Sequence, residues 1–98
     1  MPLFHLHALD KAGALDVRLA NRAAHLEWAR SYEDKILMAG PMFAEDGETF
    51  AGSAFVLNMD SLEAVRAWAA EDPYARAGLF QSVEIRPFKW VIGSGPGD

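Results

Sequence analysis

Two residues whose types suit acid–base chemistry, His25 and Asp72, lie far apart in this 98-residue chain. Histidine titrates near neutral pH, and a carboxylate held against one ring nitrogen fixes the tautomer and leaves the other nitrogen free to act as a base. Asp72 also has a structural interpretation, because Asp followed by Pro73 is a good N-cap and first residue for a short helix. One carboxylate has two oxygens, so both roles can coexist. The pattern predicts an acid–base pair that only the fold can assemble.

A row of basic side chains recurs at helical spacing before residue 32, and it comprises Arg18, Arg22 and His25. Arginine forks match the oxygens of carboxylates and enolates, so Arg18 or Arg22 is a candidate to hold a small acid beside His25. The alternative for each arginine is a solvated helix face, or an ion pair with one of the surplus acidic residues. At about 100° per residue, this basic row lies beside an apolar row that we expect to face the core. The apolar row consists of Leu15, Leu19 and Leu26.

Ser53 and Tyr74 are two further candidates for substrate binding. Ser53 follows Gly52 inside an expected strand but lacks the G-x-S-x-G context of a nucleophile elbow, so we predict a polar contact rather than a nucleophile. Gly52 itself allows the close approach of a backbone or a ligand. Tyr74 is expected to border the same cleft, although a turn or packing role also explains it.

His5 and His7 share one face of an expected strand and, together with His25, offer three imidazoles. This spacing is common by chance and no carboxylate is tied to it, so we expect no metal site. We place His5 and His7 instead on the cleft or on a dimer interface. The sequence contains no G-x-G-x-x-G or P-loop pattern, so it predicts no nucleotide, and we expect no cofactor.

The composition argues against several classes of protein. Nine Lys and Arg against fourteen Asp and Glu give a net charge of -5, which disfavours a nucleic-acid partner and docking on an anionic membrane. The absence of cysteine removes disulfides, thiolate zinc sites and cysteine nucleophiles. No apolar run approaches the roughly 20 residues that span a bilayer, and the N-terminus lacks the features of a signal peptide. A packed cytoplasmic domain is therefore expected.

Apolar periodicity predicts four strands and two main helices. The expected order is a strand at 3–9, a helix at 14–32, strands at 36–43 and 50–58, a helix that opens at 60–63 and stops at 72–73, a short turn at 74–79 and a strand at 82–92. Asp60 is the expected N-cap of the second helix, while Pro41 and Pro87 predict breaks, bulges or edges in their strands. This β-α-β-β-α-β order is that of a ferredoxin-like α+β fold, with a four-stranded antiparallel sheet and helices on one face.

Residues 1–92 are expected to form a single domain, followed by a flexible tail at 93–98. The expected strands are apolar on both faces, so one face of the sheet needs a cover other than the helices. The economical cover is the same face of a second subunit, which predicts a homodimer through the sheet face.

The chain resembles the YciI family of YCII-related domains, and the resemblance runs from the first strand to Ile92. The motifs that carry it are Arg18 and Arg22 with the step at 24–26, the segments 39–42 and 52–53, the segment 72–74 with 77–78, and the segment 87–89. Their joint order and spacing are more specific than any one of them alone.

The resemblance implies a dimeric α+β barrel built from two ferredoxin-like units, with a cleft in which His25 and Asp72 form a catalytic dyad. The family is similar to muconolactone isomerases, antibiotic-biosynthesis-type monooxygenases and a dehydrochlorinase of chlorinated hydroquinones. The hairpin loop at 44–49 is short in this chain, which puts any lid built there in doubt.

Two kinds of function fit these residues. The first is a small cofactor-free enzyme of isomerase or lyase type that acts on a small organic acid, lactone or quinol-like substrate. In it, His25 is the base, Asp72 orients His25, and Arg18 or Arg22 anchors an anion. The second is a non-catalytic module that binds a small ligand or only mediates a dimeric interaction. The sequence leaves the choice between an enzyme and a binding module open.

Overall fold

The computed structural model describes residues 2–93, and they form four strands, two main helices and a short third helix. In chain order the elements are β1 (Leu3–Asp10), α1 (Leu15–Arg30), β2 (Ile36–Phe43), β3 (Phe50–Asn58), α2 (Leu62–Ala70), α3 (Pro73–Arg76) and β4 (Phe80–Phe88). The β-α-β-β-α-β order predicted from the sequence is confirmed, with α3 as the short turn expected after Pro73.

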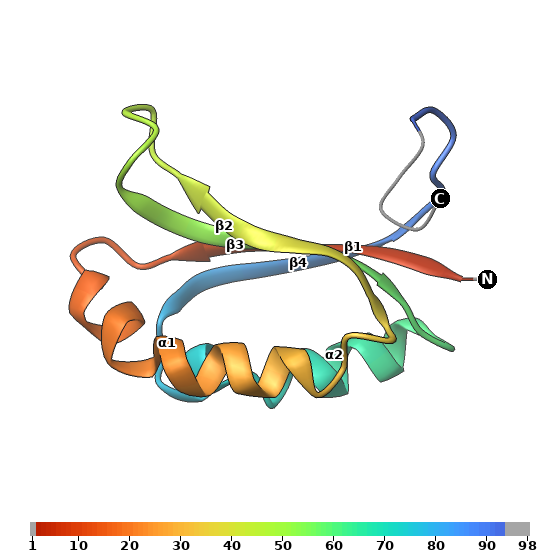
Figure 1. Ribbon diagram of the computed structural model, residues 1–98, viewed down its shortest axis with the longest axis horizontal. Helices are drawn as coiled ribbons and strands as arrows, with labels where there is room; N and C mark the ends of the chain where they lie inside the picture. The colour runs from red at the N-terminus through yellow and green to blue at the C-terminus, as the bar shows by residue number, and fades with distance from the viewer. Residues whose placement is uncertain (1, 94–98) are drawn as a thin grey trace.

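The four strands form one antiparallel sheet in the order β2-β3-β1-β4, which is the ferredoxin-like arrangement. All helices lie on one face of this sheet, and the opposite face carries no helix of residues 2–93 (Figure 1). Both β2 and β4 are edge strands, which is where Pro41 and Pro87 are tolerated. The fold class expected from the sequence is therefore confirmed.

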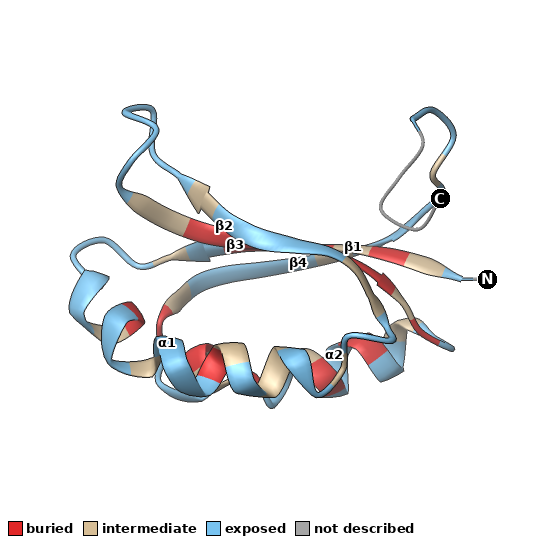
Figure 2. Ribbon diagram, in the orientation of Figure 1, coloured by how far each residue is buried: buried red, intermediate tan, exposed pale blue. Residues whose placement is uncertain are grey.

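The core lies between the sheet and the two main helices (Figure 2). Alternate residues of β1 face it, and Phe4, Leu6 and Ala8 are only 5%, 3% and 0% exposed. Phe55 and Leu57 of β3 pack on the same side, as the two-residue repeat of paired strands requires.

The buried side chains of α1 are Arg18 and His25, not the leucines that the apolar pattern predicts to face the core. Leu15 and Leu19 are 46% and 54% exposed, whereas Arg18 and His25 are 3% and 8% exposed. The expectation that the leucine row faces the core is therefore wrong. The physical reason is that Arg18 and His25 each have an acidic partner inside the fold, so these two side chains can be buried without leaving a charge unpaired.

Two element boundaries also differ from the prediction. Ser61, not Asp60, is the N-cap of α2, and its hydroxyl accepts a hydrogen bond from the backbone N–H of Ala64 at 3.1 Å. Strand β4 ends at Phe88, which pairs with the first residue of β1, so the predicted stretch at 89–92 has no strand left to pair with. The expected tail lies beyond the described residues except for Gly93.

Candidate functional site

His25 and Asp72 meet inside the fold, although they lie on different helical elements. Nδ1 of His25 is 2.7 Å from Oδ1 of Asp72, and their side chains are 10% and 5% exposed. An ionised carboxylate has no proton to donate, so Nδ1 donates this hydrogen bond. The proton of a neutral His25 ring is thereby held on Nδ1, and Nε2 keeps its lone pair.

The turn into α3 holds Asp72 in place. Asp72 is the N-cap of α3, and its Oδ1 accepts a hydrogen bond from the backbone N–H of Tyr74 at 2.9 Å. Pro73 fills the first helical position, where no N–H is needed. The two roles foreseen for Asp72, cap and partner of His25, thus coexist on one carboxylate.

Tyr74 supports the ring of His25 from one side. The two rings are stacked, with centroids 4.0 Å apart and planes 13° from parallel. Tyr74 is buried, and Cζ of Arg18 lies 4.6 Å from its ring centroid. Burial raises the pKa of the Tyr74 phenol, and the positive charges of Arg18 and Arg22 act against that rise. The phenol is therefore a neutral group beside the two guanidiniums at ordinary pH.

Arg18 is fully engaged within the protein. Its Nε and Nη2 donate to the two carboxylate oxygens of Asp10 at 2.7 Å and 2.9 Å, and Nη2 also donates to Oγ of Ser53 at 3.0 Å. Burial acts against the charge on Arg18, but the hydrogen bonds and charge of Asp10 more than offset it and raise the pKa of the guanidinium. Arg18 and Ser53 therefore hold each other in place at the edge of the site.

Arg22 differs from Arg18 in both exposure and pairing. It is exposed, and within residues 2–93 it has no ion-pair partner. It lies one helical turn after Arg18 and borders the same cleft as His25. Of the two arginines proposed as an anion anchor, Arg22 is the one with an unused charge.

The cleft has a volume of about 190 Å³ and lies between α1, α3 and the β2–β3 pair. All the site residues predicted from the sequence line it except Asp72, which contacts His25 through Nδ1. Its lining comprises Arg18, Arg22, His25, Leu26, Ala29, Ala39, Gly40, Pro41, Phe50, Ser53, Phe55 and Tyr74. His25 lines this cleft, and its Nε2 is neither fully buried nor hydrogen-bonded to another described residue. Nε2 is therefore open to the cleft.

His5 and His7 do not join the cleft. They pair across the sheet with Arg86 and Glu84 of β4, on the face away from the helices. Among residues 2–93, no group of three or more His, Asp or Glu side chains is placed to hold a metal ion. The two histidines thus lie on the uncovered sheet face and belong to a different surface from His25.

Asp10 is the site residue that sequence reasoning missed. Asp10 follows the strand predicted at 3–9, yet its carboxylate is the partner that allows Arg18 to be buried. A signal was present, because Asp10 continues the alternation of Phe4, Leu6 and Ala8 and so points to the inner face. A carboxylate on an inner face indicates a buried cation nearby.

The chain belongs to the family of YCII-related domains, whose model matches residues 3–89. A protein YciI from Escherichia coli is 42% identical over 97 residues, which cover 92% of this chain and 99% of that protein. An uncharacterised protein from Haemophilus influenzae is 38% identical over 94 residues, covering 89% and 96% of the two chains. The resemblance seen in the sequence motifs is confirmed.

Among solved structures, a 5-chloro-2-hydroxyhydroquinone dehydrochlorinase from Burkholderia phenoliruptrix, in complex with 2,5-dihydroxybenzoquinone, is similar with a TM-score of 0.81 and 30% identity. The match covers 93% of this chain and 95% of that one. An antibiotic biosynthesis monooxygenase has the same fold, with a TM-score of 0.55 and 16% identity. Within residues 2–93, the helices are too short or too polar to cross a membrane.

Proposed function

We propose that this protein is a small acid–base enzyme in which His25 and Asp72 act as a dyad on a small oxygenated organic substrate. The observation that carries the proposal is the 2.7 Å contact between Nδ1 of His25 and Asp72, which leaves Nε2 facing the cleft. A base held in one tautomer and one orientation is what proton abstraction requires.

In the proposed reaction, Nε2 of His25 takes a proton from a carbon next to a carbonyl or enol group. The electron pair moves onto the neighbouring oxygen, and Arg22 offsets the charge that develops there. The imidazolium then returns the proton at another carbon, which is an isomerisation, or a leaving group departs, which is an elimination. Asp72 stabilises the imidazolium and does not itself take the proton.

The shape of the cleft and a similar protein support this substrate class. Phe50, Phe55 and Pro41 supply flat apolar walls beside Arg22, which suits a compact ring or chain that carries oxygen substituents. The similar dehydrochlorinase, whose name places its chemistry on a chlorinated hydroxyhydroquinone, supports a quinol, lactone or short oxo acid for this chain. Tyr74 and Ser53 complete the lining as polar contacts.

The test is exchange of carbon-bound hydrogen with solvent deuterium, because it detects proton abstraction without knowledge of the full reaction. The protein is incubated in D₂O with hydroxyhydroquinones, butenolides and short oxo acids, and exchange is followed by proton NMR. We expect the wild type to catalyse exchange in at least one compound, and His25→Gln to slow it by about 100-fold or more.

Three variants separate the roles within the site. Asp72→Ser keeps a capping oxygen for the N–H of Tyr74 but cannot reach His25, so we expect exchange to slow while the fold is retained. Arg22→Gln should weaken binding and leave the rate at saturation less affected than His25→Gln does. Arg30→Gln, at the far end of α1, is the matched control and should behave as wild type.

Exchange that survives in His25→Gln would overturn the dyad. Ligand binding without exchange for any of these compounds would instead favour a binding module.

We also propose a homodimer through the sheet face opposite the helices. That face exposes Leu9 and Met38, each at 41%, and Phe88 at 39%, and the described chain has nothing to cover them. Light scattering should give at least twice the chain mass of 10.8 kDa, and Met38→Glu should lower the mass of the assembly. A wild-type monomer would overturn this proposal.

A further inference from the structure

Strand β4 ends the sheet on the side away from the cleft, and its outer edge has no strand partner within residues 2–93. An edge of this kind presents free backbone N–H and C=O groups and invites pairing with another strand. β4 is nine residues long, so the free edge is longer than most natural edges that are left open.

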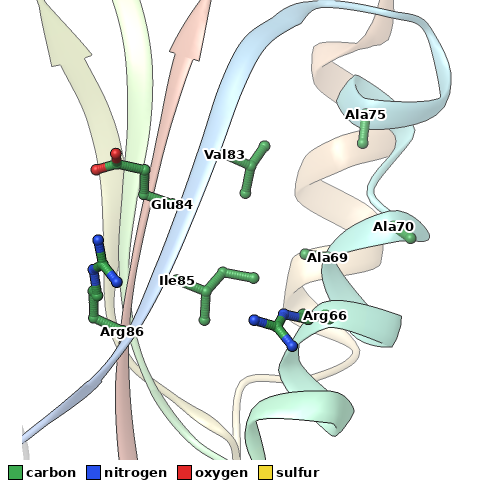
Figure 3. A pocket seen from close by; sticks show the side chains of 8 residues that line it. All are labelled: Arg66, Ala69, Ala70, Ala75, Val83, Glu84, Ile85 and Arg86. Carbon is green, nitrogen blue, oxygen red and sulfur yellow. The ribbon is translucent and has the colours of Figure 1, made fainter.

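A large hollow lies beside this edge, between β4 and α2 (Figure 3). Its volume is about 460 Å³, and alanines of α2 and α3 leave it wide. Val83 and Ile85 point from β4 toward α2, while Glu84 and Arg86 point to the other side of the strand (Figure 3). Val83 is 42% exposed, so the hollow has an apolar floor that the described chain does not cover.

We propose that β4 pairs antiparallel with β4 of a second copy of this chain, about a two-fold axis at Ile85. A two-fold axis at that residue places Glu84 opposite Arg86 of the partner subunit, and Arg86 opposite Glu84 of the partner subunit. Opposite charges directly across an antiparallel pair are favourable, and the two-fold repeats the contact. Ile85 then meets its own copy on the helix side, where the hollow receives both side chains.

The backbone of β4 fits this pairing. Pro87 has no N–H, and in an edge strand that gap faces outward. Because alternate residues of an antiparallel strand direct both N–H and C=O to the same neighbour, Ile85 shares the outward direction with Pro87 and can exchange two hydrogen bonds with its copy. The only donors lost are those of the two prolines, at the ends of the paired segment.

This interface is separate from the one proposed on the sheet face, because it uses an edge and the helix-side residues of β4. It joins two sheets into one continuous sheet, with α2 of each copy beside the junction. Charge complementarity favours a second copy over an unrelated peptide, since the pattern of β4 is complementary to itself.

A single cysteine tests the geometry cleanly, because the chain has none. In Ile85→Cys, the Cα atoms of the two copies would lie about 5.5 Å apart, within the range that a disulfide bridges. In Val83→Cys, on the same face of the same strand, the copies would be offset by four residues, or about 13 Å along the strand. We expect oxidised glutathione to convert Ile85→Cys into a covalent dimer about tenfold faster than Val83→Cys.

Charge reversal in the Ile85→Cys background provides the second readout. Glu84→Arg places an arginine opposite Arg86 of the partner subunit at both ends of the junction, and we expect crosslinking to slow by about tenfold. Adding Arg86→Glu in the same chain restores both pairs and should restore the rate. Equal crosslinking of the two cysteine variants, or a folded Ile85→Cys protein that stays monomeric on oxidation, would overturn the proposal. So would a charge reversal that the second change does not rescue.

Discussion

Two hollows of this protein differ in what lines them, and the smaller of the two contains the candidate catalytic residues. The cleft beside α1 measures about 190 Å³ and is lined by His25 and by two arginines, of which Arg18 is buried and Arg22 is exposed. The hollow between β4 and α2, called the groove below, measures about 460 Å³ and has an apolar floor with charges at its rim. Size therefore does not locate a site here, whereas buried polar groups with fixed partners do.

The difference between the hollows has an energetic basis. In the cleft, each buried polar group is satisfied by one specific partner, as Arg18 is by Asp10. Removing one member leaves the other buried and unpaired, which costs far more than the pair contributes to stability. In the groove, Arg66 is exposed, so its removal leaves no buried group without a partner.

The largest expected contrast is between these two arginines. Arg18→Met leaves the Asp10 carboxylate without its partner, and we expect the free energy of unfolding to fall by about 3 to 5 kcal/mol. Arg66→Met should change it by no more than about 0.5 kcal/mol. Urea unfolding of both variants measures the difference, and equal stabilities would break the comparison.

A pair of glycines tests how closely β3 packs against its neighbouring strands. A Cβ on Gly52 would overlap the backbone oxygen of Ala8 and lie 2.6 Å from Cε of Met42, whereas a Cβ on Gly40 meets nothing within 4 Å. We expect Gly52→Ala to lower the free energy of unfolding by about 1 to 3 kcal/mol. Gly40→Ala, in the neighbouring strand, should leave it almost unchanged, and a similar loss in both would show that packing is not the cause.

Ser53 offers a smaller test within the cleft. Its hydroxyl accepts a hydrogen bond from Nη2 of Arg18, and its side chain is buried. Ser53→Ala should cost about 1 kcal/mol of unfolding free energy, since Arg18 keeps its two bonds to Asp10. Ser82→Ala, on exposed β4, should cost nothing measurable, and a larger loss at Ser82 would contradict the contrast between the two hollows.

The smallest effect lies outside both hollows, in the hairpin loop. Hydrogen bonds from the Thr49 hydroxyl and from the backbone N–H groups of Thr49 and Glu48 lower the pKa of Asp46 from 3.8 to about 2. A carboxyl with a lowered folded-state pKa stabilises the fold above about pH 4 and loses that contribution as the pH falls through about 2. Asp46→Asn should therefore melt below wild type at pH 6, with the gap closing by about pH 2. A gap that persists at pH 2 would show a different cause.

Much of the fold could be predicted because it depends on local patterns. Alternation separates the buried residues of β1 from the others, and Asp72 followed by Pro73 identified the start of α3. The inner face of α1 could not be predicted by hydrophobicity, because Leu19 is exposed and Arg18 is buried. That reversal depends on Asp10, a partner supplied by another element, and a periodicity within one helix contains no information about it.

The positions of the site residues could be predicted from the sequence, but their individual roles could not. The helical spacing of Arg18, Arg22 and His25 correctly placed them on one stripe beside a cleft. It did not distinguish an arginine that braces the fold from one that is free, because only tertiary contacts with Asp10 and Ser53 separate them. The end of β4 likewise depended on where its partner strand begins.

The most direct test of the dyad is long-range proton–nitrogen NMR of the His25 ring, which reports the nitrogen that carries the proton. In the neutral ring we expect the proton on Nδ1, held by Asp72, and an unprotonated Nε2. In Asp72→Ser, which keeps the cap for α3, that preference should be lost. A wild-type ring protonated on Nε2, or a tautomer ratio unchanged in Asp72→Ser, would contradict the account.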